Sequence, residues 1–280
     1  MTVRWVGPAG KVSPVMQLAY VPLLKVQREI YTIPAGAARF QAYLRQLIND
    51  AGDDLRLPLG GMNPMGREHV PLLLEAYLGL DADGRAERAA AEAAAEVAGE
   101  PGDYKLALVI VDDAKGGWTN RAAAELEHCR GENPLRQRGW LVGFLWTSEL
   151  PSAAAVQAEV RAVVHRAAYL GRHGPARTLR ELLAQEGAVL VRSGAPRPGD
   201  ELSADDLAYT REVLQPRLDA SDVPTLVAAL FGDAAARALG HPPLGLSARA
   251  GFALARSQAQ AGTDQAVWLQ KGARALGPRK

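Results

Sequence analysis

Two stretches of the chain are apolar almost without interruption, which is the pattern of strands covered on both faces. Residues 104–111 read Y-K-L-A-L-V-I-V, and residues 140–146 read W-L-V-G-F-L-W. A strand with one face in water would alternate between apolar and polar side chains, whereas an inner strand of a parallel sheet is apolar at successive positions. We therefore predict two buried strands, with 104–111 at the centre of a parallel sheet.

Two further segments have weaker strand character. Residues 55–59, L-R-L-P-L, alternate, although Pro58 would restrict them to a sheet edge or an extended loop. Residues 188–191, A-V-L-V, form a short apolar run. Each of the four segments is followed by a loop and a helical pattern, and such units imply right-handed crossovers in a parallel sheet flanked by helices.

The N-terminal part has the spacing of helices. One helix is predicted over residues 15–31, starting at Ser13-Pro14 and divided by Pro22, because proline removes a backbone donor and clashes with the preceding turn. A second helix is predicted from Pro34 to about Asn49.

Helices are also predicted between and after the strands. Apolar positions recur at helical spacing over residues 70–78, 122–129 and 156–170. Residues 84–98 are rich in alanine with charges four residues apart, which predicts a solvated surface helix. Cys129 is predicted in the core, and His165, His173 and His241 on the surface or in loops.

The C-terminal part is predicted to be helical. Ser203 and Asp206 form a capping pair for a helix that reaches about Leu214, and residues 222–261 are helical with breaks at Gly240 and at residues 242–243. The fold class is therefore α/β, a mostly parallel sheet flanked by helices. We expect an N-terminal helical segment (1–50), an α/β core (51–200) and a helical C-terminal segment (201–280), packed as one compact unit.

Charge and cysteine content narrow the functional classes. The chain has 32 basic and 31 acidic residues among 280, so it lacks the basic surface of a nucleic-acid-binding protein. Its single cysteine excludes an intrachain disulfide. No stretch approaches the length of about 18 apolar residues that a membrane span needs. These features predict a soluble cytoplasmic protein without nucleic-acid or membrane partners.

Candidate chemistry follows the predicted strands. In open parallel sheets, ligands bind beyond the carboxyl ends of the strands, where the loops converge. The loops concerned are residues 60–69 (G-G-M-N-P-M-G-R-E-H), 112–121 (D-D-A-K-G-G-W-T-N-R), 147–149 (T-S-E) and 192–197 (R-S-G-A-P-R). We predict that these loops form one pocket.

Asp112 and Asp113 are the principal candidates. They could bind Mg²⁺ or Mn²⁺, act as a general acid and base, or accept hydrogen bonds from a substrate, with Lys115 close by to balance their charge. The structural alternative is that Asp112 caps the loop and Asp113 faces water. The choice stays open at this point.

The rest of this loop could hold an anion. Gly116 and Gly117 allow free backbone amides to face a phosphate or carboxylate near a helix start, where Trp118 or Thr119 is the expected cap. Asn120 and Arg121 follow in the first helical turn, and Glu149 adds a carboxylate from the next loop. An ordinary tight turn would explain the glycines equally well.

Two histidine patterns have competing explanations. His69 follows N-P-M-G-R-E and could be a general base held by Glu68 or Asn63, or a packed side chain. Arg121, Glu125 and His128 form either an ion-pair ladder on an exposed face or an anion clamp beside a metal-binding E-x-x-H pair. The chain has no nucleotide-binding glycine motif and no G-x-S-x-G serine-hydrolase motif.

We therefore predict an α/β enzyme that acts on a small substrate carrying a phosphate or carboxylate, by hydrolysis or group transfer. Catalytic roles are assigned to Asp112, Asp113, His69 and Lys115, with a divalent metal on the two aspartates in one version. Substrate contacts are assigned to Asn63, Gly116, Gly117, Asn120, Arg121 and Glu149. The alternative is a non-catalytic ligand-binding or scaffold protein that forms a homodimer through its helices.

Overall fold

The chain folds around a small parallel sheet. The computed structural model describes residues 16–114, 117–131, 133–194 and 202–262. Its three strands are β1 (Gln17–Tyr20), β2 (Asp103–Val111) and β3 (Trp140–Trp146), in the order β1-β2-β3 with both pairs parallel. The predicted α/β class and the central place of residues 104–111 are thus confirmed.

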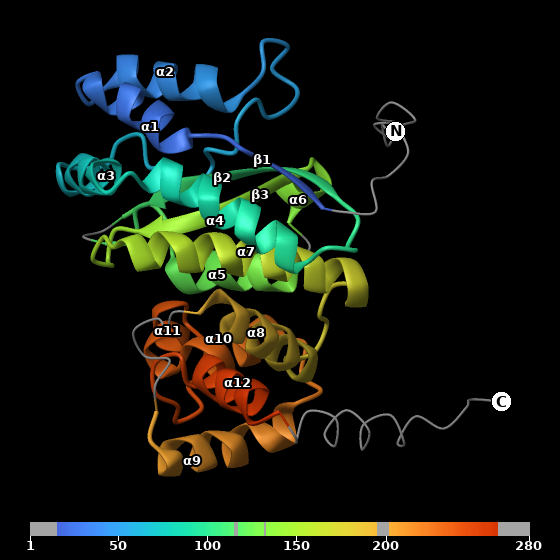
Figure 1. Ribbon diagram of the computed structural model, residues 1–280. Helices are drawn as coiled ribbons and strands as arrows, with labels where there is room; N and C mark the ends of the chain where they lie inside the picture. Colours follow the sequence, from blue (N-terminus) through green and yellow to red (C-terminus); the bar gives the residue numbers. More distant parts are fainter. Residues whose placement is uncertain (1–15, 115–116, 132, 195–201, 263–280) are drawn as a thin grey trace.

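Helices cover the sheet and continue below it. Figure 1 shows α1 and α2 on one side of the sheet and α7 and α5 on the other, with the remaining C-terminal helices beyond α7. The helices around the sheet are α1 (Leu23–Thr32), α2 (Ala37–Leu47), α3 (His69–Gly79), α4 (Ala82–Glu96), α5 (Arg121–Arg130), α6 (Pro134–Gln137) and α7 (Ala153–His173). The C-terminal helices are α8 (Leu179–Ser193), α9 (Ala204–Leu214), the short η1 (Gln215–Arg217), α10 (Val223–Phe231), α11 (Asp233–Ala238) and α12 (Ala250–Ala261).

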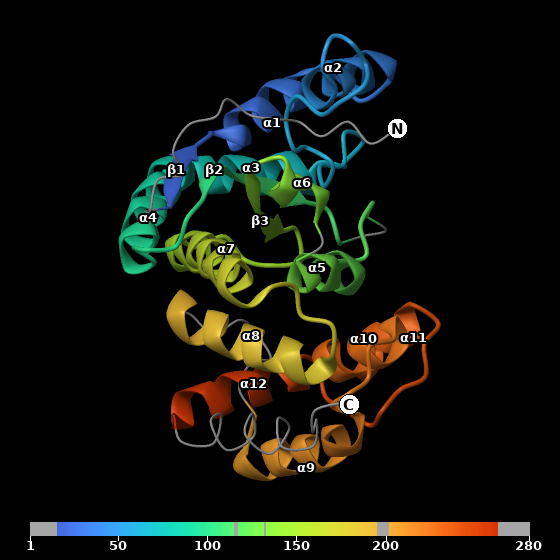
Figure 2. The ribbon, with the colours of Figure 1, turned by 90° about the vertical axis from the view of Figure 1, so that its right-hand side faces the viewer.

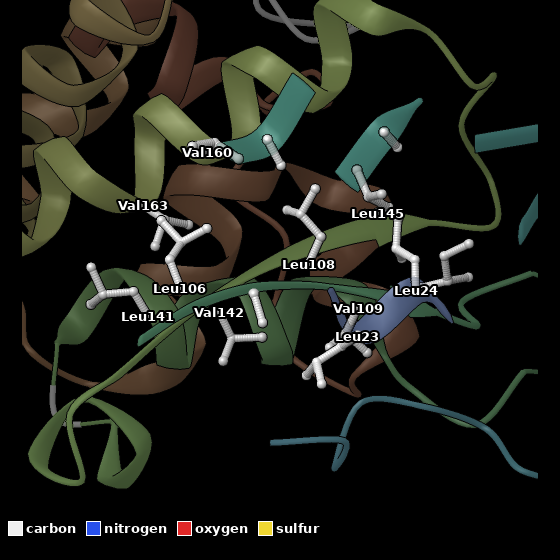
Figure 3. Close-up of a cluster of buried hydrophobic side chains, with 14 of the residues drawn as sticks. Leu23, Leu24, Leu106, Leu108, Val109, Leu141, Val142, Leu145, Val160 and Val163 are labelled. Atoms are coloured by element: carbon white, nitrogen blue, oxygen red, sulfur yellow. The ribbon is translucent and has the colours of Figure 1, made fainter. Parts of the chain in front are cut away.

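The first core is built on β2. Residues 106–111 of this strand are almost completely buried, because both faces of the sheet are covered. Figure 3 shows Val160 and Val163 of α7 on one side of the sheet and Leu23 of α1 on the other. Burial of each large aliphatic side chain stabilises the fold by about 2 kcal/mol, which explains the uninterrupted apolar sequence.

Two buried side chains form hydrogen bonds with backbone groups at the edges of the sheet. β1 pairs with β2 only up to Leu106, so among the described residues no strand neighbours the edge of β2 beyond it. There Gln27 of α1 donates to the Ile110 carbonyl at 3.1 Å and accepts from the Ile110 N–H at 2.9 Å. On the outer edge of β3, Glu159 of α7 accepts from the Phe144 N–H at 2.9 Å. Both side chains are buried, so a three-stranded sheet leaves these backbone groups satisfied.

A second core lies between the C-terminal helices. Figure 2 shows α8, α10 and α12 stacked below α7 and α5. Its buried members include Leu182, Leu226, Phe231 and Phe252. A buried ion pair joins the two layers, since Arg166 of α7 makes two bonds of 2.8 and 2.7 Å to Glu186 of α8.

Three expectations about secondary structure were wrong. Residues 17–20 form strand β1, where a helix was predicted over 15–31; Ser13-Pro14 lies outside the described residues. Residues 55–59 form no strand, since only Leu55 makes an isolated bridge, to Ile48. Residues 188–191 belong to helix α8, where Leu190 packs in the second core and Val191 is exposed. In each case long-range packing overrides the local pattern.

Other expectations concerned burial. The alanine face of α4 packs against β1 and α7, so this helix is not simply a solvated one. His165 is buried and bonded to Glu96, where a surface position was expected. Cys129 is a core residue as predicted. None of the helices in the described part of the chain combines the length and the apolar character of a membrane span.

The role of Gln27 can be tested by replacing it with leucine. Gln27→Leu leaves the Ile110 N–H and carbonyl unpaired in the core, so we expect the free energy of unfolding to fall by at least about 2 kcal/mol. Urea denaturation measures the change. The control is Gln41→Leu on the exposed side of α2, which should lie within about 0.5 kcal/mol of the wild type. Equal stability of the two variants would contradict the proposed edge role.

Candidate functional site

The buried carboxylate of Asp112 stands at the carboxyl end of β2. Its side chain accepts hydrogen bonds from three donors that belong to other segments: the amide of Asn63 at 2.8 Å, Nε2 of His69 at 2.8 Å and the hydroxyl of Thr147 at 3.0 Å. Asp112 is 2% exposed. Loops 60–69, 112–121 and 147–149 therefore meet at this edge of the sheet, as the topology rule predicts.

The hydrogen bonds set the charge state of Asp112. Burial raises the pKa of this carboxyl group, but the bonds from His69, Asn63 and Thr147 lower it by more, so the pKa lies below its ordinary value. Asp112 is therefore an anion at neutral pH and favours a proton on the nitrogen of His69 that faces it.

Asp113 is bound by the loop that follows β3. Its carboxylate accepts from the Ser148 backbone N–H at 2.9 Å, from the Ser148 hydroxyl at 2.6 Å and from the Thr147 hydroxyl at 3.1 Å. Thr147 has one hydroxyl proton and lies within reach of both carboxylates, so it can donate to only one of them at a time. The two acids thus share one donor, and the structural alternative of an Asp113 that merely faces water is wrong.

Arg121 balances the charge of the surrounding acids. Its guanidinium donates to Glu125 at 2.7 Å and to Glu149, contacts Ser148 at 3.2 Å and lies 3.9 Å from Asp113. Burial lowers the pKa of Arg121, but Glu125 and Glu149 raise it by more. The positive charge of Arg121 is therefore already balanced by carboxylates of the protein itself.

The expected ladder on an exposed face is wrong for two of its three members. Glu125 is buried and also accepts from Arg249 of the C-terminal unit at 3.0 Å. His128 is stacked on Phe144 with ring centres 4.2 Å apart. The metal-binding interpretation of the Glu125 and His128 pair stays a prediction.

The loop after Asp112 is tightly closed. The Thr119 N–H donates to the Asp112 carbonyl at 3.1 Å, and a Cβ on Gly117 would lie 2.4 Å from the same oxygen, so only glycine fits. The cap of α5 is Asn120, whose side chain accepts from the Ala123 N–H at 3.1 Å, and not Trp118 or Thr119 as expected. Lys115 and Gly116 lie outside the described residues.

His69 is placed by its own loop. It is the first residue of α3, and its side chain is 16% exposed. Asn63 is held by Tyr31 of α1, whose hydroxyl donates to the Asn63 carbonyl at 2.5 Å. Within the described part of the chain, Nδ1 of His69 has no hydrogen-bond partner, so this nitrogen can face a ligand.

A metal ion fits this arrangement poorly. The residues that the structure describes contain no group of three or more histidine, cysteine or carboxylate side chains that could hold one. Both aspartates instead accept hydrogen bonds from amide, hydroxyl and ring N–H groups, which a cation would have to replace. No step of the proposed chemistry below is therefore assigned to a metal.

Sequence reasoning placed most of the cluster but missed two of its supports. Of the predicted loop 192–197, residues 192 and 193 belong to α8, and residues 195–197 lie outside the described ones. Tyr31 and Arg249 contact site residues, and no local pattern marks them, since each comes from a distant helix or helix start.

No protein-family model, curated protein or solved structure matches this chain. The geometry of its own side chains is therefore the evidence for its function.

The charge of Asp112 gives a prediction about acid stability. A carboxyl group whose pKa is lowered by folding stabilises the protein at pH values above its pKa in the unfolded chain, which is 3.8 for an ordinary aspartate. This stabilisation is lost as the pH falls from there through the lower pKa of the folded protein. We expect Asp112→Asn to be less stable than the wild type at pH 7 and the difference to shrink as the pH falls below about 4. Urea denaturation at a series of pH values measures it.

The matched control is Asp205→Asn, at an exposed position in the first turn of α9. Its difference from the wild type should be small at each pH. A stability difference for Asp112→Asn that stays constant between pH 7 and pH 3 would contradict the hydrogen-bonded anion.

Proposed function

We propose that the chain is an enzyme that catalyses hydrolysis or group transfer on a small substrate at the carboxyl edge of its sheet, with His69 as general base and acid. The observation that carries the proposal is the 2.8 Å hydrogen bond between Nε2 of His69 and the carboxylate of Asp112. This carboxylate is buried and also accepts hydrogen bonds from Asn63 and Thr147. A carboxylate in this position fixes the orientation and tautomer of an imidazole and stabilises its protonated form.

The free nitrogen of His69 would carry out the proton transfer. With the proton on Nε2 held by Asp112, Nδ1 can accept a proton from a water or a substrate hydroxyl and return it to the leaving group. Asn63 and Thr147 add further hydrogen bonds to Asp112, so the carboxylate cannot turn away from the ring. Asp113 is assigned to holding loop 147–149 in place through Ser148.

The proposed substrate is a small anion bearing a phosphate or carboxylate, and Lys115 would have to supply most of its charge recognition. Arg121 is occupied by Glu125 and Glu149, so it is a poor anion clamp. The N–H groups of the glycine segment 116–117 are the remaining candidates for contact with the anion.

A second candidate function is binding without catalysis. The large apolar side chains exposed in the α/β part surround this site: Met65, Leu72, Trp118 and Leu150 have exposed fractions between 44% and 89%. Each is within three residues of His69, Asn63, Glu149 or Thr119. Exposed apolar side chains gathered in one region are typical of contact surfaces, and a homodimer would cover them.

The catalytic proposal is tested by turnover of p-nitrophenyl acetate and p-nitrophenyl phosphate as general hydrolase probes. We expect His69→Gln and Asp112→Asn to lower kcat/KM for the accepted probe by about 100-fold or more. His241→Gln, which changes a histidine in the C-terminal unit, should leave kcat/KM unchanged. Wild-type activity no higher than that of the two site variants would contradict the catalytic role.

The binding alternative makes a different prediction. If the apolar rim is a dimer contact, Leu150→Ser combined with Trp118→Ser should convert a dimer into a monomer in native mass spectrometry, because it removes much of the apolar contact area. Tyr209→Ser, which changes an exposed aromatic on α9, is the control. A wild-type protein that is monomeric at micromolar concentration would exclude this alternative.

A further inference from the structure

A pocket lies at the opposite end of the sheet from Asp112. It has a volume of about 310 Å³ and is formed by the end of α4, the second half of α7 and the last turns of α8. Glu100 lies three residues before the start of β2, whereas Asp112 directly follows its end, so the two sites stand at the amino and carboxyl edges of the same strand. A volume of about 300 Å³ is enough for a small organic ligand.

The acids of this pocket already have cationic partners. Glu96 accepts two bonds of 2.8 Å from Arg161 and one of 3.1 Å from His165. Glu100 accepts from Arg172 at 2.9 Å. Neither carboxylate is therefore available to balance a further positive charge in the pocket.

Arg192 supplies that further charge. It lines the pocket from the last turn of α8, and within the described residues its guanidinium makes one hydrogen bond, a long one of 3.4 Å to the Ala188 carbonyl. No carboxylate in the described part of the chain pairs with it. A guanidinium without a counter-ion beside a concave surface favours a phosphate or carboxylate, to which it can donate two parallel hydrogen bonds.

Beside these charged groups, aromatic and aliphatic side chains also line the pocket. The rings of Tyr169 and His173 lie 4.4 Å apart at centre on α7, and Val97 and Val189 face the same space. A flat ring can pack against such a wall while an attached anionic group reaches Arg192.

We infer that this pocket binds a small organic anion, an aromatic ring bearing a phosphate or a carboxylate, with Arg192 holding the anionic group and Tyr169 contacting the ring. This site is separate from the proposed active site, and its occupation does not depend on whether His69 and Asp112 perform catalysis.

Binding is measured by isothermal titration calorimetry on the full chain with phenyl phosphate, benzoate, inorganic phosphate and phenol. We expect phenyl phosphate or benzoate to bind more tightly than inorganic phosphate or phenol, because only they use both the charge and the ring. The tighter of the two identifies the preferred anionic group. Arg192→Gln should weaken that ligand at least tenfold, which corresponds to the loss of one charge-assisted hydrogen bond.

Two control variants test whether the loss of binding is specific to Arg192. Arg45→Gln, at an exposed position on α2, should bind like the wild type and controls for the loss of one positive charge. Asp112→Asn should also bind like the wild type, which separates this site from the carboxyl edge. No heat of binding from either ring-bearing anion at millimolar concentration, or undiminished affinity in Arg192→Gln, would overturn the inference.

Discussion

The buried negative charge of Asp112 is the constraint on which the loops of this fold depend. A carboxylate removed from water destabilises the protein by several kcal/mol unless donors replace its hydration. Here the donors come from residues 63 and 69, on loop 60–69, and from residue 147, on loop 147–149. Each loop can therefore adopt its observed position only while the others hold theirs, and the continuous apolar sequence of β2 is what delivers the carboxylate to that point.

The same charge balance continues into the C-terminal unit. Asp113 lies beside Arg121, Arg121 donates a hydrogen bond to Glu125, and Glu125 accepts another from Arg249 at the start of α12. Arg249 has a left-handed backbone (φ 58°), which is unfavourable for a residue with a side chain, and it stacks over Phe252 at 4.4 Å. A strained residue is thus held where it completes an ionic chain from the site to the second core, so the two cores are joined by charge as well as by apolar packing.

The sequence predicted what local patterns determine and missed what distant partners determine. Uninterrupted apolar runs identified β2 and β3, and the rule for strand ends then located Asp112 and Thr147 in one place. His69 was expected there through a strand over residues 55–59 that does not form, so its position beside Asp112 follows from the loop before α3 and not from the rule. Residues 17–20 and 188–191 were misassigned because a short apolar run fits a strand or a helix equally well, and only the partner, β2 or α12, decides. Tyr31, Gln27 and Arg249 are ordinary helix residues in sequence, and their roles follow from contacts more than 30 residues away.

The formal net charge of +1 does not describe how the charges are paired at the two edges of the sheet. At the carboxyl edge, the carboxylates of Asp113, Glu125 and Glu149 face the guanidinium groups of Arg121 and Arg249, whereas Asp112 faces His69. At the amino edge, the acids are matched by cations and Arg192 has no carboxylate partner among the described residues. Helix α7 begins after the carboxyl end of β3, and its second half lines the pocket at the amino edge. The proposed proton-transfer site and the proposed anion pocket therefore lie at opposite edges of one sheet, and what distinguishes them is that Asp112 faces His69 at one edge and Arg192 lines the pocket at the other.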